Sequence, residues 1–241
     1  MTDAEIARRA LPLLDLTDLS DACTAADITA LCAAARASGV AAVCVWPQFV
    51  AQAARDLAGS GVRIATVVNF PAGGEDVAGT LRETRAALAD GADEIDLVLP
   101  YPALRDGRPE AARAMVDAVR AMCAETCLKV ILETGMLAPD LIRQASRLAL
   151  AAGADMIKTS TGKTAISATP EAAEIMLEAI RDGGGRQGLK VSGGLRTVAD
   201  AARYLDLADR MMGSGWARPD TFRIGASALR AALVAALEPT A

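Results

Sequence analysis

The segment AAGADMIKTS, residues 151–160, decides the fold. It joins the end of an alanine-rich helical stretch to a short apolar strand, and Gly153 lies between the two. Glycine suits the left-handed backbone position that ends a helix. The same order of helix, glycine and strand recurs around Gly39, Gly61 and Gly91. Repeats of this kind are typical of βα units, which build a parallel sheet.

Eight strands are predicted along the chain, with amphipathic helices between them. No linker rich in Pro or Ser divides the sequence. Eight βα units in 241 residues predict an α/β fold, a single (β/α)8 TIM barrel domain over residues 1–241. A short N-terminal helix is expected before the first strand, and a doubly wound open sheet is the alternative fold. The predicted strands are Leu11–Leu16, Ala41–Val45, Val62–Val68, Glu94–Leu99, Leu128–Glu133, Met156–Thr159, Gly188–Val191 and Phe222–Ile224.

Charge and hydropathy limit the partners and the location. The net charge of −5 argues against nucleic acid, whose phosphate backbone attracts basic proteins. The N-terminus carries acidic residues at positions 3 and 5 and lacks the pattern of a signal peptide. The stretch Ala37–Ala54 is uncharged, but Gly39 and Pro47 interrupt it, which favours a strand and a new helix over a membrane span. A cytoplasmic protein without a membrane partner is therefore predicted.

The sequence contains no histidine. This excludes Ser-His and Cys-His nucleophile pairs and the common zinc sites. The five cysteines form no CxxC pair, so neither a disulfide framework nor a zinc knuckle is expected. Acid–base chemistry must then come from Lys, Asp, Glu, Tyr or Cys, and no metal is predicted.

Alternation along the strands places charged side chains inside the barrel. In LKVILE, residues 128–133, the apolar Leu128, Val130 and Leu132 share one side and must face the helices. The same argument applies to the other strands. It directs six charged residues inward: Asp15, Asp96, Lys129, Glu133, Lys158 and Lys190. A structural ion-pair network is the alternative to a reactive centre, and for Lys129 and Glu133 a supporting role is expected.

Lys158 and Lys190 lie near the ends of consecutive strands, where barrel enzymes place their chemistry. Two ammonium groups this close are expected to lower each other's pKa. A neutral lysine attacks a carbonyl, and the resulting protonated imine is an electron sink. We therefore interpret Lys158 as the nucleophile, Lys190 as the perturbing cation and Asp96 as a group that moves protons. Each lysine could instead be only an ion-pair partner.

Three glycine-bearing loops follow the last strands: STGKT at 160–164, SGGLRT at 192–197 and GASAL at 225–229. Barrels often bind phosphate with the loops after strands seven and eight. Gly193 and Gly194 would let the backbone approach a ligand closely. Ser227 is expected to cap the final helix and to donate to a phosphate. A tight turn would explain each loop on its own. Because all three loops are expected at the same end of the barrel as Lys158, together they favour a phosphorylated ligand.

The segments that carry these features resemble the 2-deoxyribose-5-phosphate aldolase family, in order and over nearly the whole chain. MIKTSTGK and GLKVSGGLRT are the most specific of them. The other matching segments are LLDLT (13–17), VCVWPQF (43–49), ATVVNFPAG (65–73), GADEIDLVLPY (91–101), KVILETG (129–135) and FRIGAS (222–227).

The resemblance implies a class I aldolase that reversibly cleaves deoxyribose 5-phosphate to glyceraldehyde 3-phosphate and acetaldehyde. It gives Lys158 the Schiff base, Lys190 its tuning and Asp96 a place in the proton relay. It also implies a homodimer, no cofactor and a role in deoxyribonucleotide catabolism. The residues expected to bind the substrate are Asp15, Thr17, Cys44, Thr161, Gly162, Lys163, Gly193, Gly194, Gly225 and Ser227.

The chain departs from the family pattern at three places. Ala228 follows Ser227 where many members have a second serine, so one phosphate contact is expected to be missing. Val191 replaces the usual Pro or Ala, with a small expected effect. The sequence ends LEPTA, without the C-terminal tyrosine with which some members assist proton transfer, so that function is expected to be absent or supplied by water.

Three other functions remain open at this point. A different lysine aldolase would act on another phosphorylated sugar, and donor specificity separates the two. A pyridoxal phosphate enzyme would be yellow. A non-catalytic sugar-phosphate binding protein would bind its ligand without forming an imine.

Overall fold

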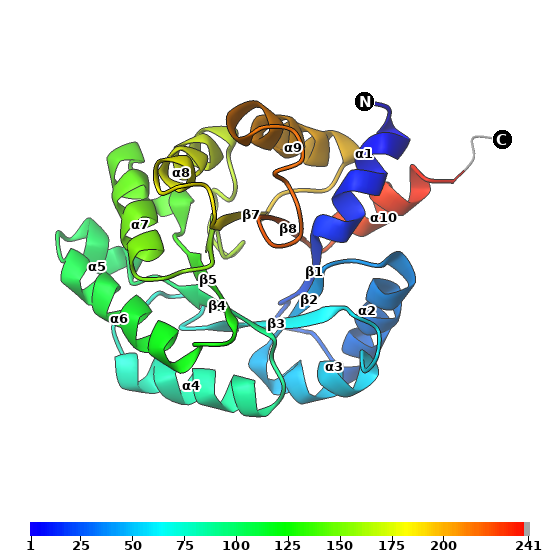
Figure 1. Ribbon diagram of the computed structural model, residues 1–241. Helices are drawn as coiled ribbons and strands as arrows, with labels where there is room; N and C mark the ends of the chain where they lie inside the picture. Colours follow the sequence, from blue (N-terminus) through cyan, green and yellow to red (C-terminus); the bar gives the residue numbers. More distant parts are fainter. Residues whose placement is uncertain (239–241) are drawn as a thin grey trace.

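Eight parallel strands pair in sequence order, and β1 also pairs with β8, so the sheet closes into a barrel. The computed structural model describes residues 1–238, and Figure 1 shows the ring of strands at its centre. Closure confirms the (β/α)8 barrel over the doubly wound open sheet. The strands are β1 (Leu14–Asp18), β2 (Ala42–Val45), β3 (Arg63–Val68), β4 (Glu94–Val98), β5 (Cys127–Ile131), β6 (Met156–Lys158), β7 (Gly188–Ser192) and β8 (Phe222–Ala226).

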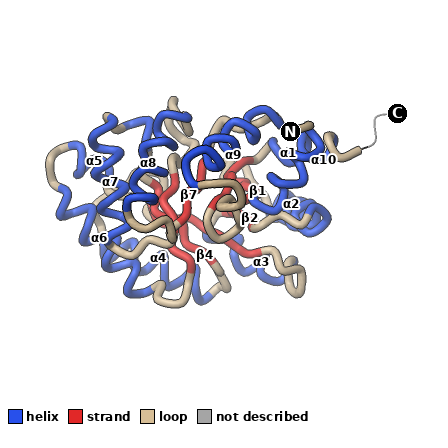
Figure 2. Tube along the Cα trace, turned by 45° about the horizontal axis from the view of Figure 1, so that its top comes forward, coloured by secondary structure: helices blue, strands red, loops and turns tan. Residues whose placement is uncertain are grey.

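Helices surround the strands, as the blue tubes around the red ones in Figure 2 show. None of the helices described over residues 1–238 has the length and apolar character that a membrane span requires. The C-terminal residues of LEPTA after Glu238 lie outside the described residues. The helices are α1 (Asp3–Ala10), α2 (Ala25–Ser38), α3 (Val50–Asp56), α4 (Val77–Ala89), α5 (Tyr101–Arg105), α6 (Pro109–Met122), α7 (Pro139–Ala151), α8 (Pro170–Asp182), α9 (Val198–Met212) and α10 (Leu229–Ala235).

The first strand begins three residues later than predicted. Residues 11–13 form a 3-10 turn that continues α1, and the strand starts at Leu14. Pro12 explains the difference, because its fixed backbone angle suits the first turn of a helix and it lacks an N–H for a sheet. The glycine signal was correct: Gly39 ends α2 with φ +61°, and Gly153 has φ +88° after α7.

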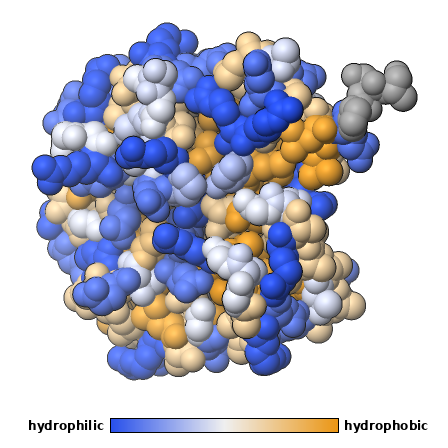
Figure 3. Space-filling model, turned by 45° about the vertical axis from the view of Figure 1, so that its right-hand side comes forward, coloured by the Kyte–Doolittle hydropathy of each residue, from blue (hydrophilic) through white to orange (hydrophobic). Residues whose placement is uncertain are grey.

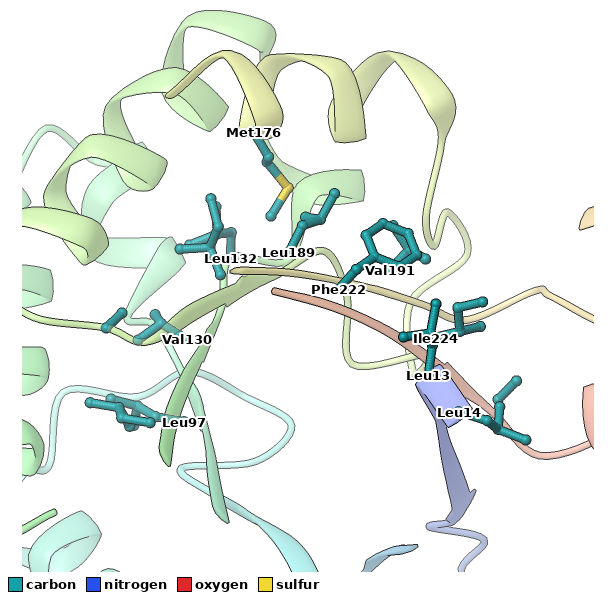
Figure 4. Close-up of a cluster of buried hydrophobic side chains, with 14 of the residues drawn as sticks. Leu13, Leu14, Leu97, Val130, Leu132, Met176, Leu189, Val191, Phe222 and Ile224 are labelled. Carbon is teal, nitrogen blue, oxygen red and sulfur yellow. The ribbon is translucent and has the colours of Figure 1, made fainter. Parts of the chain in front are cut away.

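The apolar core lies between the barrel and its helices. Leu97, Val130, Leu189 and Phe222 project from β4, β5, β7 and β8 toward the helical layer (Figure 4), and all four are fully buried. Burying a Leu or Phe side chain contributes roughly 1.5–3 kcal/mol, so this layer dominates the stability. The alternate strand positions must therefore point into the barrel, as the sequence predicted.

The outer surface is mostly hydrophilic on the side of α1 and α10, with an apolar area beside the grey terminal residues (Figure 3). Few large apolar side chains are exposed among residues 1–238; they are Met1, Met136, Ile166 and Leu237. Isolated exposed apolar residues are normal on protein surfaces. The homodimer expected from the sequence therefore stays a prediction.

Candidate active site

A cavity of about 660 Å³ opens at the carboxyl ends of the strands, between the loops that follow β1, β6, β7 and β8. This is the end at which TIM-barrel enzymes carry their chemistry. The cavity is lined by nine of the residues selected from the sequence: Thr17, Lys158, Thr161, Gly162, Lys163, Gly193, Gly194, Gly225 and Ser227. The other four, Asp15, Cys44, Asp96 and Lys190, are buried in the barrel and do not line the cavity.

Lys158 connects the cavity to the buried charges. Its Cα is paired in register with that of Lys190 on the neighbouring strand. Both ammonium groups lie 2.8 Å from Asp96 Oδ2. The three residues that sequence analysis selected as the reactive centre are therefore in direct contact.

The environment of Lys158 favours a neutral amine. Burial lowers the pKa of its ammonium, Asp96 opposes that shift, and the charge of Lys190 lowers the pKa further. The net direction is downward. A larger fraction of Lys158 is therefore neutral near pH 7 than of a free lysine, and only the neutral form is nucleophilic.

Lys190 behaves differently from the sequence prediction. We expected the two lysines to lower each other's pKa, but the pKa of Lys190 is raised. Burial lowers it, and the carboxylates of Asp15 and Asp96 outweigh burial. The Lys190 Nζ lies 2.6 Å from Asp15 Oδ2 as well as 2.8 Å from Asp96 Oδ2. Lys190 is thus a permanent cation beside Lys158, and the mutual shift predicted for the pair is wrong for Lys190.

Asp96 is held as a carboxylate. Burial favours its protonated form, but Lys129, Lys158 and Lys190 together keep its pKa well below the ordinary value. Lys129 Nζ lies 2.9 Å from Asp96 Oδ1, so each carboxylate oxygen accepts from at least one lysine. Lys129 therefore has the supporting position that the sequence suggested.

Two charged residues of the same network escaped the sequence analysis. Arg223 on β8 donates to Asp15 Oδ1 at 2.6 Å and to Glu94 Oε1 at 2.8 Å. Glu94 is fully buried and also pairs with Lys129. Strand parity could have found both, because Arg223 alternates with Phe222 and Ile224, and Glu94 shares its side of β4 with Asp96.

The charges of this network do not balance when every group is ionised. Its buried members are three carboxylates, on Asp15, Glu94 and Asp96, and four basic groups, on Lys129, Lys158, Lys190 and Arg223. The half-exposed Arg63 also pairs with Glu94. A neutral Lys158 would remove the excess positive charge of the buried groups. An unpaired buried charge costs several kcal/mol, so the balance itself favours the neutral amine.

Glu133 is buried as predicted, but it belongs to a different cluster. Its carboxylate accepts hydrogen bonds from the loop after β6 and forms no ion pair within residues 1–238. The sequence had directed it into the barrel interior with the lysines. It lies one residue beyond Leu132 with φ +56°, so its side chain leaves the strand alternation.

Two of the predicted phosphate-binding glycines are sterically required where they stand. A Cβ on Gly193, which has φ +86°, would lie 2.5 Å from Ser167 Oγ. A Cβ on Gly225 would lie 2.8 Å from Ser192 Cβ and 3.0 Å from Lys190 Cε. Gly225 thus makes room for the Lys190 side chain. Its role is packing inside the barrel as well as lining the cavity.

Ser227 does not cap the final helix. The N-cap of α10 is Ala228, and no side chain makes the capping bond. The prediction was wrong because the helix begins one residue later than the serine requires. Ser227 still lines the cavity.

Two cationic side chains border the cavity. Lys163 Nζ lies 2.9 Å from Asp21 Oδ1 and 5.6 Å from the centre of the Trp46 ring. Arg196 also lines the cavity and is exposed. Arg196 was not predicted from the sequence, although it lies in the segment SGGLRT, residues 192–197. Its position shortly after the paired glycines could have identified it as a residue of the phosphate loop.

Cys44 lies in an apolar cluster beneath the mouth of the barrel. Leu19, Ala65 and Val67 are the other buried members, and Trp46 and Phe70 pack against them. Burial raises the pKa of the Cys44 thiol, so it stays protonated. This cluster offers apolar contacts rather than a second nucleophile.

A second cavity of about 350 Å³ lies at the amino ends of the strands and includes Arg63, Asp155 and Arg223. Barrel enzymes use the opposite end for chemistry, so we assign this one no reaction. Among residues 1–238, no group of three or more His, Cys, Asp or Glu is arranged to hold a metal ion.

Comparison with known proteins shows that the chain is similar to aldolases. A profile of the DeoC/LacD family aldolases matches residues 9–235. A deoxyribose-phosphate aldolase from Agrobacterium fabrum is 54% identical over 229 residues, which cover 92% of this chain and 88% of that protein.

Two solved structures share the fold and have 32% and 25% sequence identity to this chain. One, from Coccidioides immitis, is described as a deoxyribose-phosphate aldolase, with 32% identity, a TM-score of 0.84 and coverage of 95% and 85% of the two chains. The other is the tetrameric deoxyribose phosphate aldolase from Aeropyrum pernix, with 25% identity, a TM-score of 0.80 and coverage of 97% and 92%. Since the family profile spans nearly the whole chain and a relative is more than half identical, the chain belongs to the DeoC/LacD family of aldolases and is a lyase.

Proposed function

We propose that this aldolase reversibly cleaves 2-deoxy-D-ribose 5-phosphate to D-glyceraldehyde 3-phosphate and acetaldehyde through a Schiff base on Lys158. The name of the Agrobacterium fabrum relative supports the substrate. The observation that carries the mechanism is Lys158 itself. It is a buried lysine with a lowered pKa whose side chain reaches a cavity wall.

In this mechanism the neutral Lys158 amine attacks the C1 aldehyde of the open-chain sugar, and loss of water gives the protonated imine. The bond between C2 and C3 then breaks. Its electron pair moves toward the imine nitrogen and forms an enamine, while the C3 hydroxyl loses its proton and becomes the aldehyde of glyceraldehyde 3-phosphate. Protonation of the enamine at C2 and hydrolysis of the imine release acetaldehyde and regenerate the amine.

Asp96 and Lys190 support these proton transfers. Both lysine nitrogens lie 2.8 Å from the same Asp96 oxygen, which places this carboxylate to assist proton transfer at Lys158 directly or through water. Lys190 stays protonated and keeps the Lys158 pKa low. Leu19, which lines the cavity and belongs to the apolar cluster around Cys44, would contact the methyl group of acetaldehyde.

The phosphate is proposed to bind at the exposed mouth of the cavity. Lys163 and Arg196 supply positive charge there. Gly162, Gly193 and Gly194 line the same region, and their small size lets the backbone approach a ligand. Thr17 and Thr161 also line the cavity and would contact the sugar hydroxyls. The substrate role assigned to Asp15 would act through Lys190.

Borohydride trapping tests the proposal directly. The protein is incubated with deoxyribose 5-phosphate, reduced with borohydride and mapped by peptide mass spectrometry. An adduct on Lys158 is expected, and it should vanish in Lys158→Met. Lys163→Met is the matched control, because it removes a lysine from the same cavity and should keep the adduct on Lys158.

Other outcomes separate the competing functions. An adduct on Lys190 would exchange the two lysine roles. A yellow protein with visible absorption would indicate pyridoxal phosphate. A folded protein that binds the sugar phosphate and gives no adduct would contradict the Schiff base and favour a binding protein. The predicted cytoplasmic location and homodimer remain predictions beside this proposal.

A further inference from the structure

Glu133 has an unusual position for a carboxylate. It follows β5 directly, its φ of +56° lies in the left-handed region, and its side chain is fully buried. Only one other non-glycine residue among 1–238, Asn69, has a positive φ. Non-glycine residues held in this region often mark functional sites, because the surrounding contacts must maintain the conformation.

The partners of Glu133 all come from the loop after β6, which carries Lys158 at its last position. The Thr161 N–H lies 3.3 Å from Oε1 and 3.4 Å from Oε2, and the Thr161 hydroxyl donates to Oε2. The Thr164 hydroxyl lies 3.3 Å from Oε1. Residues 1–238 place no Lys or Arg nitrogen within 4.0 Å of this carboxylate.

These bonds determine the direction of the Thr161 hydroxyl. A threonine hydroxyl has one proton to donate and two lone pairs that accept. Its proton goes to Glu133, and one lone pair accepts from the Lys163 N–H at 3.0 Å. One lone pair remains, on a residue that lines the cavity. Toward a ligand, Thr161 can therefore accept a hydrogen bond but cannot donate one.

In its ionised form, the Glu133 side chain makes this direction unique. An ionised carboxylate only accepts, whereas an amide in its place could turn its NH2 group toward Thr161 and reverse the hydroxyl. A carboxylate buried without a cation is costly, and neutral hydrogen bonds would suffice to hold a loop. A carboxyl group at this position, rather than an amide, thus suits a requirement for a fixed hydroxyl direction.

We propose that Glu133 is a positioning residue that fixes Thr161 as an acceptor for a hydroxyl group of the substrate. The inference rests on the proposed aldolase reaction. In the direction of synthesis, the hydroxyl that fits this role is the C2 hydroxyl of glyceraldehyde 3-phosphate. Glu133 would thereby make the enzyme prefer acceptor aldehydes that carry a hydroxyl next to the carbonyl.

A pair of acceptor aldehydes measures this preference. Glyceraldehyde 3-phosphate is compared with 3-oxopropyl phosphate, which has the phosphate and the aldehyde but no C2 hydroxyl, and acetaldehyde is the donor in both cases. The wild type should prefer the hydroxylated acceptor roughly tenfold in kcat/KM, the effect of one hydrogen bond. Glu133→Gln should reduce the preference to below about threefold, mainly through KM.

Variants of Thr161 show whether Glu133 acts through that hydroxyl. Thr161→Val should abolish the preference, and Thr161→Ser should retain it. The double variant with Glu133→Gln and Thr161→Val should behave like Thr161→Val alone, because both changes remove the same contact. Two independent effects that multiply would contradict the proposal.

Borohydride trapping of acetaldehyde alone separates positioning from general damage. Acetaldehyde carries neither hydroxyl nor phosphate, so its adduct on Lys158 should form in Glu133→Gln within about twofold of the wild-type rate. A parallel loss of trapping would mean that Glu133 supports the fold or Lys158 itself, which overturns the inference. An undiminished preference in Glu133→Gln would overturn it too.

Two further measurements keep the test decisive. If Glu133→Gln does not fold, Glu133→Asp replaces it, because its shorter side chain withdraws the carboxylate from Thr161 and should also lower the preference. Absence of any Lys158 adduct in the wild type would instead reject the aldolase mechanism, and is thus distinguishable from failure of the Glu133 role alone.

Discussion

Lys158 and Lys190 stand opposite one another on β6 and β7, and their ammonium groups both lie 2.8 Å from the same oxygen of Asp96. The two lysines have opposite pKa directions. Burial and the charge of Lys190 lower the pKa of Lys158. The pKa of Lys190 is raised because the carboxylates of Asp15 and Asp96 outweigh burial. Asp15 pairs with Lys190 and adds to the effect of Asp96 there, so the two lysines have different environments and opposite pKa directions.

Replacing Lys190 should move the pH dependence of the reaction. In Lys190→Met the charge that lowers the Lys158 pKa is absent, so that pKa rises. The acid limb of kcat/KM should then shift to higher pH, and activity at pH 7 should fall by about 100-fold or more. A pH profile with borohydride trapping checks this. Lys129→Met is the control, since it also removes a buried cation and should shift the limb less.

The two lysines should affect stability in opposite directions. Lys190 has a raised pKa, so its contribution is complete below the unfolded pKa and is lost as pH rises through the folded pKa. At pH 7, Lys190→Met should destabilise by about 3–5 kcal/mol, because it leaves buried carboxylates without a cation.

Lys158 has a lowered pKa, so protonating it at neutral pH costs stability. Lys158→Met should therefore unfold at the same or a higher urea concentration than the wild type. Urea denaturation of both variants at pH 7 tests the pair. Equal losses of stability in Lys158→Met and Lys190→Met would contradict the charge balance described for the network.

Arg223 should be required for a stable fold and should affect the reaction only indirectly. Its guanidinium joins Asp15 to Glu94, so Arg223→Met leaves both carboxylates with fewer partners and should cost about 3–5 kcal/mol. Restoring neutrality with a second change, Glu94→Gln, should recover part of that loss. The measurement is the urea midpoint of the single and double variants. No recovery would mean that the loss comes from packing rather than charge.

The exposed charges at the cavity mouth should control phosphate preference. Lys163→Met and Arg196→Ala should each raise KM for deoxyribose 5-phosphate roughly tenfold and leave activity on unphosphorylated deoxyribose nearly unchanged. Asp21→Asn should act oppositely and lower KM a few fold, because it frees Lys163 from its pair. Steady-state kinetics on both sugars test this, and equal changes on both would argue against a phosphate role.

The loss of folding stability at acidic pH should depend on protonation of the buried carboxylates. Burial opposes ionisation of Asp96, but three lysines keep its pKa well below the ordinary value. A group with a depressed folded pKa contributes stability above its unfolded pKa, about 3.9, and loses it as pH falls toward the folded value. Unfolding in acid should thus begin below about pH 4 and be less steep in Asp96→Asn. Urea midpoints measured from pH 3 to pH 7 provide the test.

The repeated α–glycine–β pattern determined the fold, because each strand needs an apolar face toward its helices, and that requirement is local. The same parity selected Lys158, Lys190 and Asp96. Parity failed at residues 11–13, where Pro12 favours a turn. The separate prediction that Ser227 caps a helix failed because that helix begins one residue later. Parity also applied to Arg223 and Glu94, which lie in the segments FRIGAS and GADEIDLVLPY but were not selected from the sequence.

Only closure of the barrel decided which charges meet. Arg223 and Asp15 are 208 positions apart and come into contact because β8 pairs with β1. Asp15 then reaches Lys190 and reverses the pKa shift expected from two neighbouring lysines. Likewise, the left-handed turn at Glu133 carries its side chain out of strand alternation and onto Thr161. Residue type and alternation follow from the sequence, whereas ion pairs depend on distances across the barrel, which arise only when its first and last strands join.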